Sequence, residues 1–205
     1  MFKLNPNSQF LPENREVNRF EHIYLVIRGQ ELLVSEDTKQ IVFLSEDELK
    51  WSGMDIAEKH FLGTIENKSC YVAELSERTI TMENTELQNM LSLLGQVRDT
   101  IFSICSRAIQ LTQWYRLNQY CGKCGAKMIK HATERAMERT SKDNLVYPKI
   151  APCIIVLVTK GEDLLLAHNK NFPGKFYSTL AGFIEAGETA EEAISREIFE
   201  EVNIN

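Results

Sequence analysis

The stretch GFIEAGETAEEAISREIFEEVNI, residues 182–204, decides how the end of this chain folds. A turn with two glycines leads into a segment whose apolar residues recur every four positions. These apolar residues are Ala190, Ile194, Ile198 and Val202. The spacing predicts one amphipathic helix over 190–202. Thr189 is a suitable N-cap, and Glu192 three residues later completes a capping box, so we expect the helix to begin at residue 190.

Carboxylates gather on the last turns of this helix. Glu197 and Glu201 are four residues apart and share one face, with Glu200 one step around. Like charges at this spacing repel one another, and the helix dipole disfavours negative charge near a C-terminus. A bound cation would relieve both effects, and a set of oxygen ligands favours Mg²⁺ or Mn²⁺. The simpler alternative is a solvated acidic face on which Glu192 and Arg196 form an i,i+4 ion pair.

The complete pattern resembles the Nudix box of the Nudix hydrolases. It runs Gly182, five residues, Glu188, seven residues, Arg196-Glu197, an aliphatic residue, one residue, then Glu200-Glu201. The resemblance implies a loop–helix–loop whose glutamates bind divalent cations that activate water on a diphosphate. Asn203 stands where the family has glycine. Asparagine tolerates the left-handed conformation better than most residues, so we still expect the helix to end there.

The same resemblance implies a role for each residue of the box. Glu197 and Glu201 are the expected principal metal ligands, and Glu200 is a further ligand or the general base. Arg196 is expected to orient the carboxylates. Glu188 is expected to brace the loop before the helix. The backbone carbonyl of Ala181 is expected to face a cation.

Upstream residues resemble the NADH pyrophosphatase branch of that family, which also removes NAD caps from RNA. The matching segments are Cys121-Gly-Lys-Cys124-Gly125, Tyr147-Pro148-Lys-Ile-Ala-Pro152 with the strand that follows it, and residues 176–185. The branch implies hydrolysis of NADH, NAD⁺ or a related dinucleotide to a mononucleotide and AMP, or removal of an NAD cap from RNA, by a homodimer. It implies that Tyr147 and Glu134 contact the dinucleotide and that Phe183 stacks on a base. The alternative for these three is an ordinary core or surface position.

The branch also implies a zinc ribbon, and here the sequence departs from the pattern. A structural zinc ion takes four ligands, usually two cysteine pairs. Cys121 and Cys124 form one pair, but Arg139 and Lys142 stand where the second pair would be. The spacing of His131 does not suit a third ligand. The alternatives stay open: the single pair binds zinc, or the ribbon has no zinc and either depends on packing and ion pairs or is loose.

The order of segments predicts an α+β protein. Short apolar runs separated by turn residues predict strands at 22–28, 31–34, 40–44, 60–65 and 70–75. Helical spacing from Thr85 to Asn118 predicts a helical connector, interrupted at Gly95. The predicted domains are 1–84, β-rich and like a rudimentary Nudix fold; 85–118, the connector; 119–149, ribbon-like; and 150–205, a partial Nudix α/β/α domain. Strands are expected within this last domain at 154–158 and 164–167.

Composition limits the binding partners and the cellular compartment that we expect for this chain. The 205 residues carry a formal net charge of −6, which argues against broad nucleic-acid binding and mildly favours a small-molecule substrate. No apolar run approaches the length of a membrane span, and the N-terminus lacks the apolar core of a signal peptide. Five cysteines without disulfide-scaffold spacing favour a reducing compartment. The sequence therefore predicts a cytoplasmic protein that does not bind membranes.

The sequence ends directly after the box, whereas a Nudix domain is expected to continue with further strands. One interpretation is a truncated homologue of the hydrolase. Two further interpretations follow from it: a binding or dimerisation module with an impaired site, and a non-functional remnant.

Overall fold

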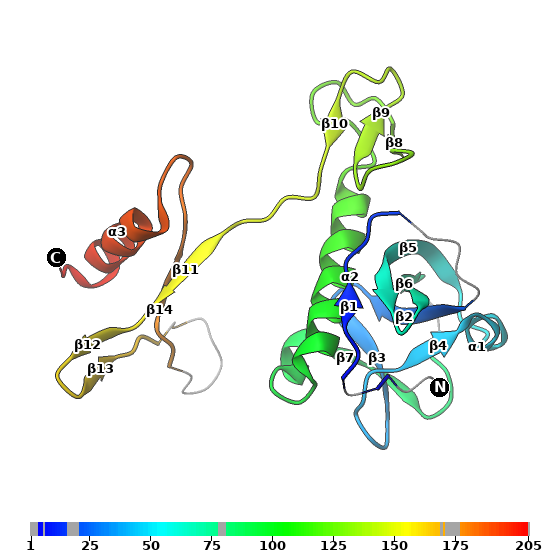
Figure 1. Ribbon diagram of the computed structural model, residues 1–205, viewed down its shortest axis with the longest axis horizontal. Helices are drawn as coiled ribbons and strands as arrows, with labels where there is room; N and C mark the ends of the chain where they lie inside the picture. Colours follow the sequence, from blue (N-terminus) through cyan, green and yellow to red (C-terminus); the bar gives the residue numbers. More distant parts are fainter. Residues whose placement is uncertain are drawn as a thin grey trace. The chain divides into compact units, whose positions relative to one another are not determined.

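The computed structural model describes residues 4–5, 7–15, 21–77, 81–168, 170 and 177–204. They form two compact units, Met1–Pro148 and Lys149–Asn205 (Figure 1). The predicted α+β class, with a β-rich N-terminal part, is confirmed. Among the described helices, none is long and apolar enough to cross a membrane.

The first unit is built on a seven-stranded sheet with the order β1-β5-β6-β2-β3-β7, in which β4 also pairs with β2. Its strands are β1 (Phe10–Leu11), β2 (His22–Arg28), β3 (Glu31–Ser35), β4 (Phe43–Ser45), β5 (Ile56–Ile65), β6 (Lys68–Leu75) and β7 (Thr85–Asn89). The β2–β6 pair is parallel, and the other pairs are antiparallel. The strands predicted over 22–28, 31–34, 60–65 and 70–75 are confirmed.

Strand β2 is apolar along its length because both of its faces are covered. Ile23, Leu25 and Ile27 belong to the core cluster that includes helix α2 (Asp99–Leu117). The alternate residues Tyr24 and Val26 belong to the core cluster that includes Leu49 of helix α1 (Glu46–Trp51). Because side chains alternate across a strand, a strand with two covered faces has an unbroken apolar sequence.

Two short elements were not anticipated from the sequence. Residues 85–89, expected to be helical, form strand β7, which pairs with β3 from Glu31↔Asn89 to Ser35↔Thr85. These residues form a strand because the edge of β3 supplies backbone hydrogen-bond partners, which a local sequence pattern does not reveal. Helix α1 begins after Ser45, whose side chain and Glu48 form a complete capping box.

The rest of the first unit follows β7. The 3₁₀ helix η1 (Met90–Leu93) is separated from α2 by a turn in which Gly95 has a φ of 74°, so the predicted interruption is confirmed. After α2 comes a three-stranded antiparallel ribbon in the order β10-β9-β8. Its strands are β8 (Met128–Lys130), β9 (Met137–Arg139) and β10 (Leu145–Val146). Met128 and Met137 pack into the core cluster that contains α2, so the ribbon is part of this unit.

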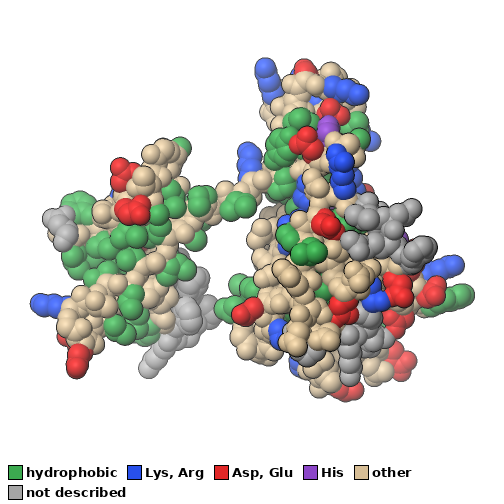
Figure 2. All heavy atoms as spheres, in the orientation of Figure 1, with side chains coloured by type: hydrophobic (Ala, Val, Ile, Leu, Met, Phe, Trp, Pro, Cys, Tyr) green, Lys and Arg blue, Asp and Glu red, His purple; other side chains and the backbone are tan. Residues whose placement is uncertain are grey.

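The second unit consists of β11 (Cys153–Val156), β12 (Val158–Lys160), β13 (Asp163–Leu165), β14 (Leu180–Phe183) and helix α3 (Ala190–Val202). Strand β11 pairs with β14, and β12 with β13. The bounds and capping box predicted for α3 are confirmed, and Asn203 ends the helix at a φ of 54°. Figure 2 shows hydrophobic side chains gathered on this unit, and Ile155 is 72% exposed. Residue 176, where a matching segment was expected to begin, lies outside the described residues.

A close approach between β1 and β5 generates a first prediction. A Cβ at Gly63 would lie 2.1 Å from the backbone oxygen of Leu11 and 2.8 Å from the ring of Phe10. We expect Gly63→Ala to lower the free energy of unfolding by about 1–3 kcal/mol or more, because backbone atoms must move to admit the methyl group. Urea unfolding followed by tryptophan fluorescence would measure it, since both tryptophans, Trp51 and Trp114, lie in the first unit.

Gly122→Ala is the matched control, because nothing lies within 4 Å of a Cβ built there. It should change the free energy of unfolding by less than about 0.5 kcal/mol. Equal free energies of unfolding for the two variants would show that the β1–β5 contact does not restrict the size of the side chain at residue 63.

Candidate functional site

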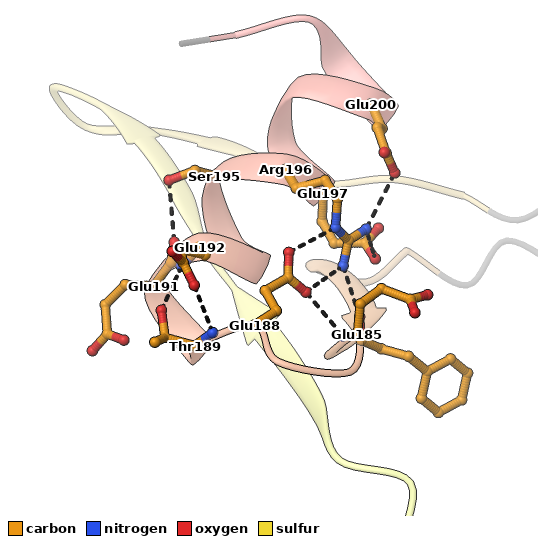
Figure 3. Close-up of polar contacts among 10 residues, drawn as sticks. Glu185, Glu188, Thr189, Glu191, Glu192, Ser195, Arg196, Glu197 and Glu200 are labelled. Carbon is orange, nitrogen blue, oxygen red and sulfur yellow. Dashed lines mark hydrogen bonds and ion pairs between the residues drawn. The ribbon is translucent and has the colours of Figure 1, made fainter.

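Arg196 lies at the centre of the polar contacts around α3 (Figure 3). Its Nε donates to Glu188 Oε1 at 2.8 Å, and its Nη2 donates to Glu188 Oε2 and to the carbonyl oxygen of Phe183, both at 2.9 Å. Its Nη1 donates to Glu197 Oε1 at 2.8 Å and to Glu200 Oε2 at 3.2 Å. One guanidinium therefore joins the helix to the loop before it and to the end of β14.

Glu188 fixes the loop from the other side of this ion pair. Its Oε2 also accepts a hydrogen bond from the backbone N–H of Glu185 at 2.9 Å. The Arg196 guanidinium, and after it this N–H group, hold the pKa of Glu188 well below its usual range, at about 2. In turn, Glu188 and then Glu197 raise the pKa of Arg196. Both charges of the pair therefore persist at neutral pH.

Gly182 makes room for the carboxylate of Glu197. A Cβ built on Gly182 would lie 1.9 Å from Glu197 Cδ and 2.0 Å from Glu197 Oε1. The carboxylate thus rests on the backbone of β14, in the space that any other side chain would fill. The peptide before it carries the carbonyl of Ala181. The sequence pattern contained this glycine, but it did not reveal the steric reason for it.

Glu192 takes part in the capping box at the start of α3. Thr189 N–H donates to Glu192 Oε2 at 2.8 Å, and Glu192 N–H donates to Thr189 Oγ1 at 3.2 Å. The described contacts of Arg196 go instead to Glu188, Glu197, Glu200 and Phe183. The simple i,i+4 pair of Glu192 with Arg196 is therefore not what organises this helix.

The donor atoms near Glu197 suit a hard cation. The carboxylates of Glu197 and Glu200 both contact Arg196 Nη1, and that of Glu197 lies against the β14 backbone. Carboxylate oxygens are the ligands that a hard cation prefers. Glu201, the residue after Glu200, is exposed. Among the described residues, no three side chains of His, Cys, Asp or Glu already converge as a metal cluster. In this arrangement Arg196 supplies the positive charge that Glu197 and Glu200 share.

The structure brings together two residues that were expected to contact a dinucleotide. Tyr147 Oη donates to Glu134 Oε2 at 2.5 Å, and this carboxylate raises the pKa of Tyr147. Both belong to the ribbon end of the first unit. Phe183, the expected stacking residue, belongs to β14 in the second unit, and its side chain is 63% exposed.

The expected zinc ligands lie at the other end of the ribbon. Arg139 Nη1 donates to the Sγ of Cys124 at 3.0 Å, and Asn144 Nδ2 lies 3.6 Å from the Sγ of Cys121. His131 Nδ1 accepts from the backbone N–H of Glu134 at 3.1 Å. Two thiols facing a guanidinium and an amide do not fit a tetrahedral zinc site.

A hollow of about 730 Å³ in the first unit was not foreseen from the sequence. It is lined by parts of β5, α2 and β8, including His60, Thr112 and Lys130. His60 stacks on Tyr115 with ring centroids 4.1 Å apart. Burial, and next the charges of Lys130 and Arg135, lower the pKa of His60 to about 3. These residues come from distant segments, so no local motif could indicate the hollow.

Comparison with protein families matches both units. A NUDIX domain model matches residues 148–205, and a model of the NADH pyrophosphatase-like rudimentary NUDIX domain matches residues 21–114. Together these two stretches contain most of β2 to α2 and the whole of the box around Arg196.

Curated relatives point the same way. NAD-capped RNA hydrolase NudC of Pseudomonas fluorescens is 36% identical over 156 residues, which cover 76% of this chain and 56% of that protein. The protein of the same name from another strain of that species is 34% identical over 181 residues, covering 88% and 64%. That of Pectobacterium atrosepticum is 40% identical over 121 residues, covering 59% and 46%. The chain spans about half the length of the curated relatives it matches.

The ion pair of Glu188 and Arg196 generates a prediction about pH. Because the pKa of Glu188 falls from 4.5 to about 2 on folding, the pair stabilises the loop fully above pH 4.5, and this contribution is lost as the pH falls toward 2. A ¹³C NMR titration of the Glu188 carboxyl should give a midpoint near 2.

Arg196→Gln should move that midpoint back toward 4.5, because the charge and the fork of donors are lost. Ser195→Ala, which removes only a hydrogen bond to the carbonyl of Glu191, should leave it unchanged. A midpoint near 4.5 in the parent protein would contradict the ion pair described here.

Proposed function

The chain belongs to the Nudix hydrolase superfamily, with the NADH pyrophosphatase-like order of a rudimentary NUDIX domain followed by a NUDIX domain, and on this premise we propose that it hydrolyses the pyrophosphate bond of NAD(H). The products are AMP and a nicotinamide mononucleotide. A related dinucleotide or the NAD cap of an RNA contains the same bond and is the other substrate of this proposal.

The observation that carries the proposal is the arrangement of Arg196, Glu197 and Gly182. Arg196 orients the carboxylates of Glu197 and Glu200 from one side, and the bare backbone of Gly182 lets Glu197 lie against β14. In this proposal Glu197 and Glu201 are the main ligands of Mg²⁺ or Mn²⁺, with the carbonyl of Ala181 beside them. A bound divalent cation supplies charge neutralisation on the phosphate oxygens and acidifies water.

Side chains of the box supply proton transfer and positioning. Glu200, whose side chain is 57% exposed, is free to turn from Arg196 and accept the proton of the attacking water, or to bind a further cation. Glu188 holds the loop and Arg196 in place. Orientation of this kind lowers the barrier because the reacting groups need no rearrangement during the reaction.

The substrate-binding part of the proposal rests on three side chains. Phe183 presents an exposed ring on which a base can stack, next to the carbonyl that Arg196 holds. Tyr147 and Glu134 are joined by a hydrogen bond and are both exposed, so their polar atoms are available to a dinucleotide. The formal net charge of −6 favours the small dinucleotide over a long RNA. We further propose a cytoplasmic homodimer.

A second candidate is a binding or dimerisation module without turnover. One observation favours it: in the described structure, Glu197 and Glu200 pair with Arg196 rather than converging with a third carboxylate as a metal cluster. An assay with NADH and Mn²⁺ separates the two candidates. Release of AMP supports the hydrolase, whereas dinucleotide binding without release of AMP supports the module.

The metal role of Glu197 gives the sharpest test. Glu197→Gln should lower kcat/KM for NADH by about 100-fold or more, because a neutral amide binds a divalent cation more weakly than a carboxylate does. The fold should persist, since the amide oxygen can still accept from Arg196 Nη1. Mn²⁺ binding, followed by electron paramagnetic resonance, should weaken in parallel.

Glu191→Gln is the matched control, because Glu191 is an exposed glutamate in the first turn of the same helix. It should hydrolyse NADH at the parent rate. If Glu197→Gln hydrolysed NADH as fast as the Glu191→Gln control, the assignment of the box as the active site would be wrong.

A further inference from the structure

The end of the ribbon that carries Cys121 and Cys124 retains a tight turn without a metal. The N–H of Cys121 donates to the carbonyl of Ala126 at 2.8 Å, and the N–H of Gly125 donates to the carbonyl of Cys121 at 2.8 Å. Gly125 has a φ of 70°, which suits this turn. Backbone hydrogen bonds therefore place the two thiols close together.

The facing turn connects β9 to β10. The N–H of Arg139 donates to the carbonyl of Asn144 at 3.0 Å, and the N–H of Lys142 donates to the carbonyl of Arg139 at 2.7 Å. Lys142 has a φ of 59° and is exposed. Arg139 and Lys142 are three residues apart, as Cys121 and Cys124 are on the turn opposite. This turn therefore has the spacing of a second pair of zinc ligands, but its side chains are cations that cannot bind zinc.

Side chains of the facing turn reach the thiols. Arg139 Nη1 is 3.0 Å from the Sγ of Cys124, and Asn144 Nδ2 is 3.6 Å from the Sγ of Cys121. The other side of the guanidinium contacts the carboxylate of Asp143, with Nε at 2.5 Å from Oδ1 and Nη2 on Oδ2. Asp143 in turn accepts from Ser141 Oγ at 2.5 Å.

The positive charge next to the thiols opposes the binding of a dication. A guanidinium cannot lose its proton in a protein, so Arg139 keeps its positive charge next to the sulfur of Cys124. Asp143, the carboxylate nearest to it, has its pKa lowered to about 2 by Arg139 first and Ser141 next. The Arg139 side chain is only 18% exposed, and Cys121 is 4% exposed, so the cation occupies the space between the two turns.

We propose that Arg139 takes the place of a structural zinc ion in this ribbon, so that the ribbon folds without metal. The guanidinium supplies one positive charge and a planar set of N–H donors. It spans from Cys124 on one turn to Asp143 on the other. The contacts of Arg139 with Cys124 and of Asn144 with Cys121 then hold the two turns together in place of four metal–sulfur bonds. The ion pair of Arg139 with Asp143 lies within one turn and fixes the guanidinium there.

The position of Arg139 gives it a further effect on the proposed substrate site. Glu134 precedes β9 and Tyr147 follows β10, so the strand pair that Arg139 closes also brings these two residues together. In this consequence, which rests on the proposed function, Arg139 is a positioning residue. The zinc measurements below test the proposal independently of any hydrolase activity.

The first experiment measures zinc in the whole chain, purified under reducing conditions with added Zn²⁺. The parent should contain far less than one zinc per chain. Arg139→Cys combined with Lys142→Cys restores two Cys-x-x-Cys pairs and should bind about one zinc per chain. Lys142→Cys alone is the matched control: it adds a thiol but keeps the guanidinium, and it should gain no zinc.

Two outcomes would overturn the proposal. One is a parent protein with stoichiometric zinc that is lost when Cys121 and Cys124 are both changed to Ser. The other is a double cysteine variant that folds but gains no zinc, because Arg139 would then not stand at a metal position. Circular dichroism would establish that each variant is folded.

The second experiment follows thiol reactivity in a Cys153→Ser background, since Cys153 is the other exposed cysteine. Zinc-bound thiolates react slowly until a chelator removes the metal, whereas thiols held by Arg139 react at the same rate with and without chelator. We expect no effect of chelator on the parent. Arg139→Met, which keeps the aliphatic stem, should speed proteolysis of the ribbon about fivefold or more.

Chelator-dependent reaction of the parent thiols, or an Arg139→Met ribbon as resistant to proteolysis as the parent ribbon, would contradict the role given to Arg139. Should Arg139→Met fail to fold, the chelator comparison on the parent still decides whether zinc is present.

Discussion

The candidate site depends on the guanidinium of Arg196. Repulsion among glutamates and an unfavourable helix dipole destabilise the last turns of α3. Arg196 offsets both by contacting Glu188, Glu197 and Glu200 at once, and it also binds the carbonyl of Phe183. A planar, permanently charged fork of donors can do this, whereas a lysine ammonium offers a point charge without the fork. Helix, loop and strand are therefore fixed relative to one another by one side chain.

In the ribbon, too, one arginine holds electron-rich side chains in place, but there it stabilises the fold rather than a catalytic site. Arg139 binds a thiol on the turn that carries Cys124 and a carboxylate on its own turn, and its side chain is 18% exposed. In both units an arginine lies among electron-rich side-chain atoms: carboxylates around Arg196, and a thiol and a carboxylate around Arg139. The outcomes differ because the donors differ. Oxygen donors around Arg196 still suit a hard cation, whereas two thiols beside Arg139 lack the remaining ligands of zinc.

Local signals in the sequence predicted the elements that local interactions stabilise. Helix α3 begins and ends where its capping box and Asn203 indicate. Strand β7 was misassigned because its stability comes from β3, some fifty residues earlier in the sequence. The neutral, buried His60 was missed for the same reason, since Tyr115, Lys130 and Arg135 approach it from distant segments.

The anchoring of Arg196 bears on how the site could accept a cation without losing its shape. Two of its donors bind Glu188, whose low pKa reflects how strongly this pair is held, and one also binds the carbonyl of Phe183. These contacts do not involve Glu197 or Glu200. If those two carboxylates turned toward a cation, Arg196 would remain fixed, and Gly182 would still leave Glu197 its space on β14. The network thus separates the contacts that hold the loop from the carboxylates that are available for chemistry.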